Sequence, residues 1–261
     1  MKKIYLLTAV LFSTVTVFAQ NTLQAQHKGL VKKVMNVPAG TAGVGPAECD
    51  TSGWGTSGAY QPEFAGVSGQ VVAFGYSGGG WVYGNNHDGL NACAQGYLNV
   101  NQASIQVDQV LLMFVGKTSV SQSATSKCVV KVYNMAANKA YNTDGAGGQA
   151  LNSPGPNQLL ASADYFFNDI DTTFGTFNVV TLATPAVIGG TDFAVVVDFS
   201  NLNAAGDTAG LLCDQVGDAQ NLDYAFHFYQ NKWYVTDFAF SQSGSGDVDN
   251  DIAIFPVINC N

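Results

Sequence analysis

Short apolar segments separated by turn-forming residues recur from residue 70 to residue 258, and this pattern limits the folds that the chain can adopt. Gln70–Tyr76, Cys128–Tyr133 and Asp192–Phe199 are typical members, rich in Val, Phe and Tyr. Gly, Asn, Asp and Pro bound the segments, which is typical of β-strands. No window of helix length carries an apolar stripe with a 3.6-residue period. About ten such segments therefore predict an all-β fold, a jelly-roll-like antiparallel β-sandwich.

The charged residues support this fold class. The chain has seventeen Asp but only two Glu, ten Lys and no Arg. Asp favours turns and caps, whereas Glu and Arg favour helix interiors. The formal net charge of −9 also argues against nucleic acid and anionic lipid as partners, because both attract clustered basic side chains.

The N-terminus has the pattern of a bacterial secretory signal peptide. Residues 1–3 carry two lysines, residues 4–18 form an uncharged and largely apolar run, and Ala19-Gln20 offers a cleavage site. The mature protein is then exported, to the periplasm, the cell surface or the extracellular medium. No later segment approaches the ~20 consecutive apolar residues of a membrane span. We expect a signal peptide at 1–19, a flexible leader at 20–47 and one β-sandwich domain at 48–261.

Five cysteines remain after this cleavage, namely Cys49, Cys93, Cys128, Cys213 and Cys260. An oxidising compartment allows disulfides, but an odd number of cysteines cannot all pair within one chain. One interpretation is one or two internal bridges plus a buried thiol. The other is that Cys260, next to the last residue, forms an intermolecular disulfide. No pair has the C-x-x-C spacing of a zinc or redox site.

Five stretches of the chain resemble motifs of a group of exported proteins: Gly79–Asn86, Ala92–Gln95, Thr191–Asp198, Gly206–Leu211 and Asp251–Ile258. Together they resemble the β-sandwich passenger domains of Bacteroidota proteins, of the kind found in type IX secretion cargo. The resemblance implies a similar fold and brings no catalytic residues. Such proteins commonly carry a C-terminal sorting domain. This chain ends at residue 261 with no segment of that kind, so we expect a member without it.

Trp81 lies in a loop rich in Gly and Asn and is the tryptophan with the best prospect of exposure. Flat aromatic rings flanked by amides are how sandwich lectins hold sugar rings. Trp81, Asn85 and Asn86 are therefore candidate sugar contacts. The alternative is that the aromatic residues fill the core, because two packed sheets need about 10 Å of side chains between them.

Asp247, Asp249 and Asp251 alternate along one loop and resemble the beginning of a calcium-binding loop. The sixth position holds Ile252, and no acidic residue stands at the twelfth, so the loop is not an EF-hand. Irregular loops of β-sandwiches also bind calcium, which makes calcium the one cofactor that the sequence suggests. The alternative is an acidic turn before the last strand.

These features predict an exported, non-enzymatic β-sandwich that acts in extracellular or cell-surface assembly or adhesion, as a matrix or filament component. Its partners are then further copies of itself or glycans. A carbohydrate-binding, lectin-like domain is the first alternative. A jelly-roll glycoside hydrolase is the second, and it would need two carboxylates about 5 to 9.5 Å apart across a cleft.

Overall fold

Most of the described residues are in β-strands, which confirms the prediction of a mainly β fold. The structure is a computed structural model that describes residues 30–36, 70–76, 79–86, 89–98, 105–121, 123–143, 146, 148–189, 191–214, 225–241 and 250–260. The predicted signal peptide, most of the predicted leader and the loop with Asp247 and Asp249 lie outside these residues. None of the helices within these ranges has the length and hydropathy needed to cross a membrane.

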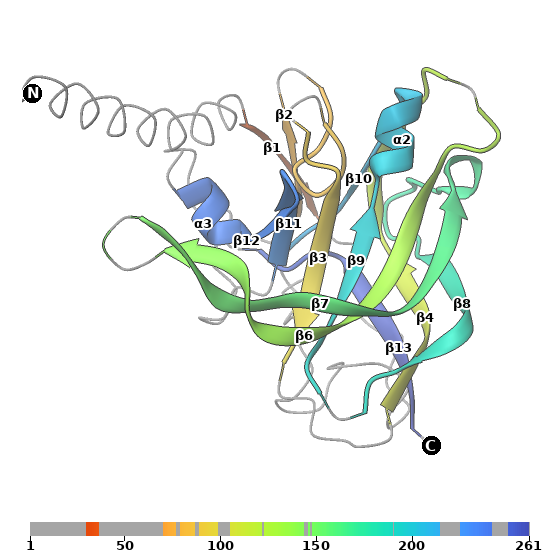
Figure 1. Cartoon of the computed structure of the whole chain (residues 1–261). Helices are drawn as coiled ribbons and strands as arrows, with labels where there is room; N and C mark the ends of the chain where they lie inside the picture. The colour runs from red at the N-terminus through yellow and green to blue at the C-terminus, as the bar shows by residue number, and fades with distance from the viewer. Residues whose placement is uncertain are drawn as a thin grey trace, which may run out of the picture.

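Six strands form one sheet in the order β12-β11-β3-β9-β6-β7, and β12 also pairs with β6. This extra pairing closes β12, β11, β3, β9 and β6 into a ring of five strands, hereafter the ring, and leaves β7 at the edge. In Figure 1 the long β6–β7 hairpin sweeps across β3 and β9 to reach β12. The strands are β3 (Ala92–Tyr97), β6 (Lys127–Thr143), β7 (Gln149–Phe166), β9 (Phe193–Asp198), β11 (Ala225–Tyr229) and β12 (Lys232–Val235).

A bulge in β6 closes the ring. Before the bulge β6 pairs antiparallel with β9, and after it β6 pairs parallel with β12 at Ala140 and Tyr141. The register shifts between Ala136 and Ala140, where Asn138 has a φ of 56°. An extra residue in one strand bends it and increases its twist. The parallel pairing and the closed ring were not predicted, and the pairings do not confirm the jelly-roll topology.

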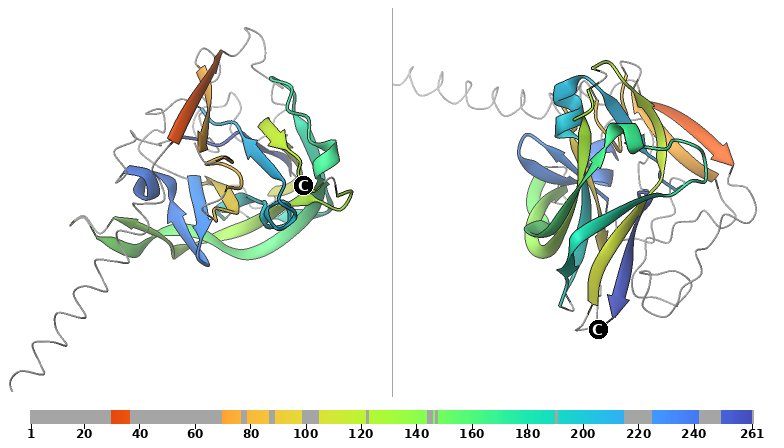
Figure 2. Two further views of the ribbon diagram at one scale, coloured as in Figure 1. Left: turned by 90° about the horizontal axis from the view of Figure 1, so that it is seen from above. Right: turned by 90° about the vertical axis from the view of Figure 1, so that its right-hand side faces the viewer.

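A second layer packs against the ring. Its three-stranded sheet has the order β13-β4-β8, and β5 pairs with β10. Bridges of Cys213 with Val72 and Ile252 connect β2 to this layer. Figure 2 (right) shows β4, β8 and β13 side by side. The strands are β2 (Gln70–Tyr76), β4 (Ile105–Leu112), β5 (Phe114–Thr118), β8 (Asn178–Val187), β10 (Thr208–Leu211) and β13 (Ile254–Cys260).

The remaining elements are short. Strand β1 (Leu30–Asn36) falls within the predicted leader and pairs antiparallel with β2. A 3-10 helix, η2 (Phe167–Asp169), joins β7 to β8. Helix α2 (Ser200–Ala205) follows β9, and helix α3 (Thr236–Ser241) follows β12. The helices thus sit at strand ends, and the strands build the core.

The main core lies between the ring and the second layer and continues on the other face of the ring, where Ala92, Ala94 and Ala140 are buried. Because side chains alternate along a strand, one face of β3 carries Cys93, Gln95 and Tyr97. Gln95 Nε2 donates to Asp251 Oδ1 (2.7 Å), and the Tyr97 hydroxyl donates to the Ile254 carbonyl (2.5 Å), so this face looks toward the second layer. A smaller core lies on the opposite side of the second layer and comprises Ala73, Leu111, Met113, Leu212, Ala253 and Phe255.

The cysteines whose side chains are described are buried thiols. They are Cys93, Cys128 and Cys213, so the predicted internal bridges do not form among them. The Cys213 thiol instead donates to the Val72 carbonyl (3.5 Å). Cys49 lies outside the described residues. The backbone of Cys260 ends β13 opposite Ile105, but its side chain is not described, and the intermolecular disulfide stays a prediction.

Candidate functional site

The loop of residues 79–86, singled out for Trp81, folds back on itself. Gly79 and Gly80 have φ values of 98° and 92°, which L side chains rarely adopt. Gly80 forms an isolated bridge with Asn86. A Cβ at Gly80 would lie 2.5 Å from the Asn85 carbonyl oxygen. Only glycine therefore allows this loop to close so tightly.

Asn85 and Asn86 hold the loop in place. Asn85 Nδ2 donates to the Asp207 carbonyl (2.7 Å), and its Oδ1 accepts from the Ala209 amide (2.9 Å). Asn86 Nδ2 donates to the Trp81 carbonyl (3.0 Å), and its Oδ1 accepts from the backbone of the 89–90 turn. Both side chains are buried. Because their polar groups are used inside the fold, we assign them to the loop instead of to the predicted sugar contact.

The side chain of Trp81 lies against two glycines, Gly116 and Gly210. A Cβ at Gly210 would overlap its Cβ and Cγ, and a Cβ at Gly116 would lie 2.8 Å from its Cζ2. The indole is half-buried and packs against the smaller core, as do Phe174 and Phe177. In this position Trp81 helps to cover that core. A sugar contact at Trp81 stays a prediction.

Asp207 connects this loop to the end of β5. Its side chain accepts hydrogen bonds from the amides of Val120 and Ser121 (2.7 and 3.0 Å) and from the hydroxyls of Ser119 and Ser121 (3.2 and 2.7 Å). Burial raises the pKa of Asp207, but the nearby hydroxyls of Ser126 and Ser121 and the two amides outweigh it and hold the pKa far below its ordinary value. The carboxylate is thus a structural anchor.

The predicted calcium loop is only partly described. Asp251 is buried; its Oδ1 accepts from Gln95, and its amide donates to Asp214 Oδ1 (2.8 Å). Asp247 and Asp249 lie outside the described residues, so calcium stays a prediction. Within the described part of the chain, no group of three or more His, Cys, Asp or Glu side chains could hold a metal ion.

A cysteine and a histidine are neighbours on paired strands at the main core. His227 on β11 is the register partner of Cys93 on β3. His227 Nδ1 lies 2.9 Å from the Thr236 hydroxyl, and Nε2 lies 2.9 Å from the Val82 carbonyl. Burial, with a contribution from Cys128, raises the pKa of the Cys93 thiol. A buried thiol with a raised pKa is a poor nucleophile, and both ring nitrogens have partners in the fold. This pair is structural.

A second candidate site lies on the face of the ring opposite to Cys93, Gln95 and Tyr97, where Ala92 and Ala140 are buried in the main core. Residues that are register partners from strand to strand form one continuous row around the ring, hereafter the ring row. Because register partners share a face of the sheet, these side chains lie on one side. The ring row is, in order, Asp164, Val129, Asp198, Ala92, Phe228, Trp233 and Ala140.

Two ion pairs and two aromatic rings stand along the ring row. Lys131 Nζ lies 2.6 Å from Asp198 Oδ2, with the two side chains 24% and 22% exposed. Phe228 and Trp233 are half-buried, with ring centroids 4.9 Å apart. Partly exposed aromatic rings beside a partly exposed ion pair suit a ligand that has both apolar and hydroxyl surface.

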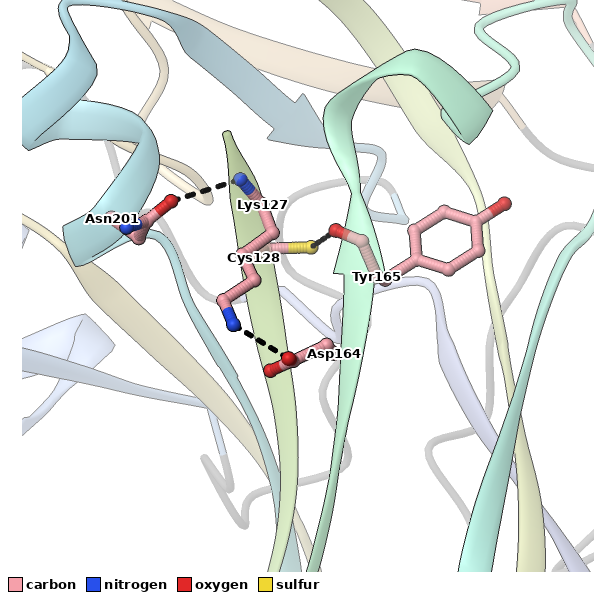
Figure 3. Close-up of polar contacts among 5 residues, drawn as sticks. All are labelled: Lys127, Cys128, Asp164, Tyr165 and Asn201. Carbon is pink, nitrogen blue, oxygen red and sulfur yellow. Dashed lines mark hydrogen bonds and ion pairs between the residues drawn. The ribbon is translucent and has the colours of Figure 1, made fainter. Parts of the chain in front are cut away.

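The second ion pair is more exposed. Figure 3 shows Lys127 between two partners: its amide donates to Asn201 Oδ1 (3.0 Å), and its Nζ lies 2.5 Å from Asp164 Oδ2. Cys128 Sγ in the same view approaches the Tyr165 carbonyl (3.6 Å). This pair links β6 to β7 at the outer end of the ring row.

Electrostatics keep Asp198 ionised. Burial raises its pKa, but hydrogen bonds from Lys131 and from Ser200, whose amide lies 2.9 Å from Oδ1, outweigh burial and lower the pKa below its ordinary value. The sequence contains no local signal for the ring row, because its members come from six strands. Only the alternation within each strand was visible beforehand.

Comparisons with known proteins assign no family. No protein-family model matches the chain, and no curated protein matches it. Among solved structures, it is similar to the cysteine protease and lectin-like domains of Cwp84, a surface layer associated protein of Clostridium difficile. The identity is 14% and the TM-score 0.42, over 78% of this chain and 36% of that one.

A clostridial cysteine protease Cwp84 after propeptide cleavage is similar at 16% identity, with a TM-score of 0.38, over 71% of this chain and 39% of that one. The chain therefore spans less than two fifths of the length of either structure. Likeness at this level assigns neither a fold family nor an activity.

Proposed function

We propose that this is an exported, non-enzymatic β-sandwich that acts in extracellular or cell-surface assembly, by association with further copies of itself. The observation that supports it is an uncharged face on the sheet β13-β4-β8, on the side away from the main core. Register partners form its three rows. The rows are Phe255–Leu111–Val179, Val257–Gln109–Thr181 and Gln106–Val187.

This uncharged face exposes apolar side chains. Val187 is 65% exposed and Val179 50%, although both are β-branched residues on a regular strand. These two valines, near the two ends of β8, leave apolar surface in water unless another surface covers it. Phe255 and Leu111 already belong to the smaller core, so the part of the face available for packing against a second copy lies along β8, at Val179, Thr181 and Val187.

Charge selects this face for contact between identical chains. Each copy carries a formal net charge of −9, so two copies repel one another at most approaches. None of the side chains in the three rows is charged, and the one acidic residue of β4, Asp108, lies at the bulge between Val107 and Gln109. A second copy presenting the same face therefore meets the least electrostatic resistance.

The test is the association state of the mature full chain, measured by analytical ultracentrifugation in reducing buffer over a range of concentrations. We expect the wild type to associate. The double variant Val179→Lys/Val187→Lys should weaken association about tenfold or more, because each complex would bury uncompensated charge. Val120→Lys is the matched control, because Val120 is 72% exposed but lies in the loop after β5.

Two results would contradict the proposal: a wild type that stays monomeric at the highest concentration, or equal effects of the double variant and the control. A parallel non-reducing gel of Cys260→Ser tests the separate prediction of an intermolecular disulfide. Loss of a covalent dimer in that variant would confirm it.

A further inference from the structure

Cys93 and Cys128 lie on strands that a third strand separates. Strand β9 pairs with β3 on one side and with β6 on the other, and Val197 is the register partner of both Cys93 and Val130. Two strand spacings and an offset of two residues along β6 therefore separate the Cα atoms of the two cysteines, roughly 10 Å in all. A disulfide requires Cα atoms within about 7 Å of one another. A bridge between Cys93 and Cys128 would thus displace β9 from the ring.

Cys213 belongs to the second layer. Its amide donates to the Val72 carbonyl (3.0 Å), and its carbonyl accepts from the Val72 amide (2.9 Å). Packed sheets lie about 10 Å apart, which is too far for a disulfide between their backbones. Tyr83 is buried nearby; burial, with contributions from Cys213 and Cys93, raises the pKa of its hydroxyl well above the ordinary value. A bridge from Cys213 to the ring would therefore force the two layers together and displace Tyr83.

The folded state also protects the three thiols from oxidants. Cys93, Cys128 and Cys213 are completely buried. Burial raises the pKa of the Cys93 and Cys128 thiols, the latter to about 12, and Cys128 Sγ lies against the Tyr165 carbonyl (3.6 Å; Figure 3). Exchange between a thiol and a disulfide requires a thiolate that the oxidant can reach. The three thiols therefore do not react while the two layers are packed together.

The unfolded chain lacks this protection. Its cysteines have the ordinary pKa of about 8.5, so a fraction of them is ionised at neutral pH. Such a thiolate attacks a small disulfide, for example oxidised glutathione, forms a mixed disulfide and releases one glutathione, which takes up the proton that the cysteine lost.

A second cysteine of the same chain then attacks the mixed disulfide in the same way and releases the second glutathione. In sum, two protein thiols are oxidised to one disulfide, and one glutathione disulfide is reduced to two thiols. The entropic cost of closing the loop rises only slowly with its length, so cysteines far apart in the unfolded chain can pair.

From this geometry we infer that the fold is a redox-sensitive device that works in one direction. Oxidation before folding joins cysteines that the native fold keeps apart and so prevents folding, whereas the same oxidant leaves the folded protein unchanged. Bridges confined to the unfolded state withdraw chains from the folding equilibrium. An exported chain would therefore have to fold before disulfide-forming oxidants reach it. This inference concerns the three buried thiols and does not rest on the proposed assembly.

The test is refolding of the mature full chain and of its Cys49→Ser/Cys260→Ser variant, which retains only Cys93, Cys128 and Cys213. Each protein is unfolded in guanidinium, reduced and freed of reductant, and then held with either oxidised or reduced glutathione before the denaturant is diluted. We expect the oxidised sample to yield about tenfold less native protein by circular dichroism, and dithiothreitol to restore the yield. Native variant held with the same oxidant for the same time should keep its spectrum and its mass.

Mass spectrometry of unreduced peptides identifies the products, and bridges among Cys93, Cys128 and Cys213 are expected in the oxidised sample. The reduced sample shows whether the variant folds at all; if it does not, the wild type with peptide mapping decides the matter. Three results would overturn the inference: equal refolding of the oxidised and reduced samples, modification of the native protein as fast as that of the unfolded chain, or a trapped chain that carries glutathione adducts without any bridge among the three cysteines.

Discussion

At the scale of single residues, Asp207 connects segments of the fold, a role that is unusual for an aspartate in a loop. Aspartate in a loop is ordinarily a turn former exposed to water. Here the side chain is buried and accepts hydrogen bonds from two amides and two hydroxyls of residues 119–121. Its own carbonyl accepts from Asn85, so one residue joins three segments of the chain.

Asp207→Asn should lower the free energy of unfolding at neutral pH by about 2 kcal/mol, because an amide replaces a charged acceptor of backbone hydrogen bonds. The folded-state pKa of Asp207 lies below the unfolded value of about 3.9. Its stabilising contribution is therefore present above that value and is lost as the pH falls through the folded-state pKa.

Urea unfolding of the wild type and the variant over a pH series measures this difference, which should be largest near neutral pH and shrink in acid. Asp169→Asn is the control, because this aspartate lies on η2 and is exposed. Equal stability of the wild type and Asp207→Asn at neutral pH would contradict the assigned role.

At the scale of elements, the loop of Trp81 packs closely against strands β5 and β10, because glycines without side chains lie at their contacts. Gly84 and Gly210 form an isolated bridge, and Gly116 is the register partner of Gly210. The indole occupies the space that Cβ atoms at Gly116 and Gly210 would fill. The glycines in these segments thus serve close packing as much as turning.

Gly210→Ala should destabilise the protein by about 1–3 kcal/mol, because the new methyl group overlaps the indole and overpacks the site. Trp81→Ala should destabilise it separately by uncovering the smaller core. The double variant Gly210→Ala/Trp81→Ala should lose less stability than the sum of the two, since the overlap with the indole ring is removed and only the contact with the Cβ of residue 81 remains. Thermal or chemical unfolding of the four proteins measures the coupling, and strict additivity would show that the two residues do not interact.

The bulge in β6 is the element that local sequence reasoning missed. Strand Lys127–Thr143 is longer than the apolar segment Cys128–Tyr133 that predicted it, because its pairing with Gln149–Phe166 continues through polar residues. A Cβ at Gly155 would lie 3.0 Å from the Cβ of Ala140, so glycine opposite the bulge eases the close approach. Nothing in the isolated segment shows that it will bend.

At the scale of the whole molecule, the buried thiols report on global unfolding. Burial raises the pKa of Cys128 to about 12 and raises that of Cys93 as well, so neither thiol ionises readily in the folded state. Cys213 is also completely buried. Reagents that attack the thiolate should therefore reach these cysteines only when the two layers separate.

The double variant Cys49→Ser/Cys260→Ser isolates the three described thiols, Cys93, Cys128 and Cys213. Under native conditions iodoacetamide should label none of them on the timescale that modifies a free thiol, and all three should react in denaturant. Mass spectrometry counts the labels. Rapid labelling of the native variant would show that these thiols are not in the core.

The candidate sites could be predicted from the sequence only in part. The loop 79–86 was recognised from its glycines and tryptophan, but the roles of Asn85 and Asn86 were not. The partners of Asn85 lie 122 and 124 residues away in the chain, at Asp207 and Ala209. An amide is the same residue type whether it faces a sugar or a backbone, and only its surroundings decide which.

Properties that depend on neighbours along the chain can be predicted from the amino-acid sequence. Alternating apolar residues, turn formers between them and the scarcity of Glu and Arg were sufficient for a mainly β fold. The closed ring, the ring row and the uncharged face were decided by the tertiary structure alone. Each depends on the register between strands far apart in the sequence, and a shift of one residue would turn every side chain of a strand to the opposite face.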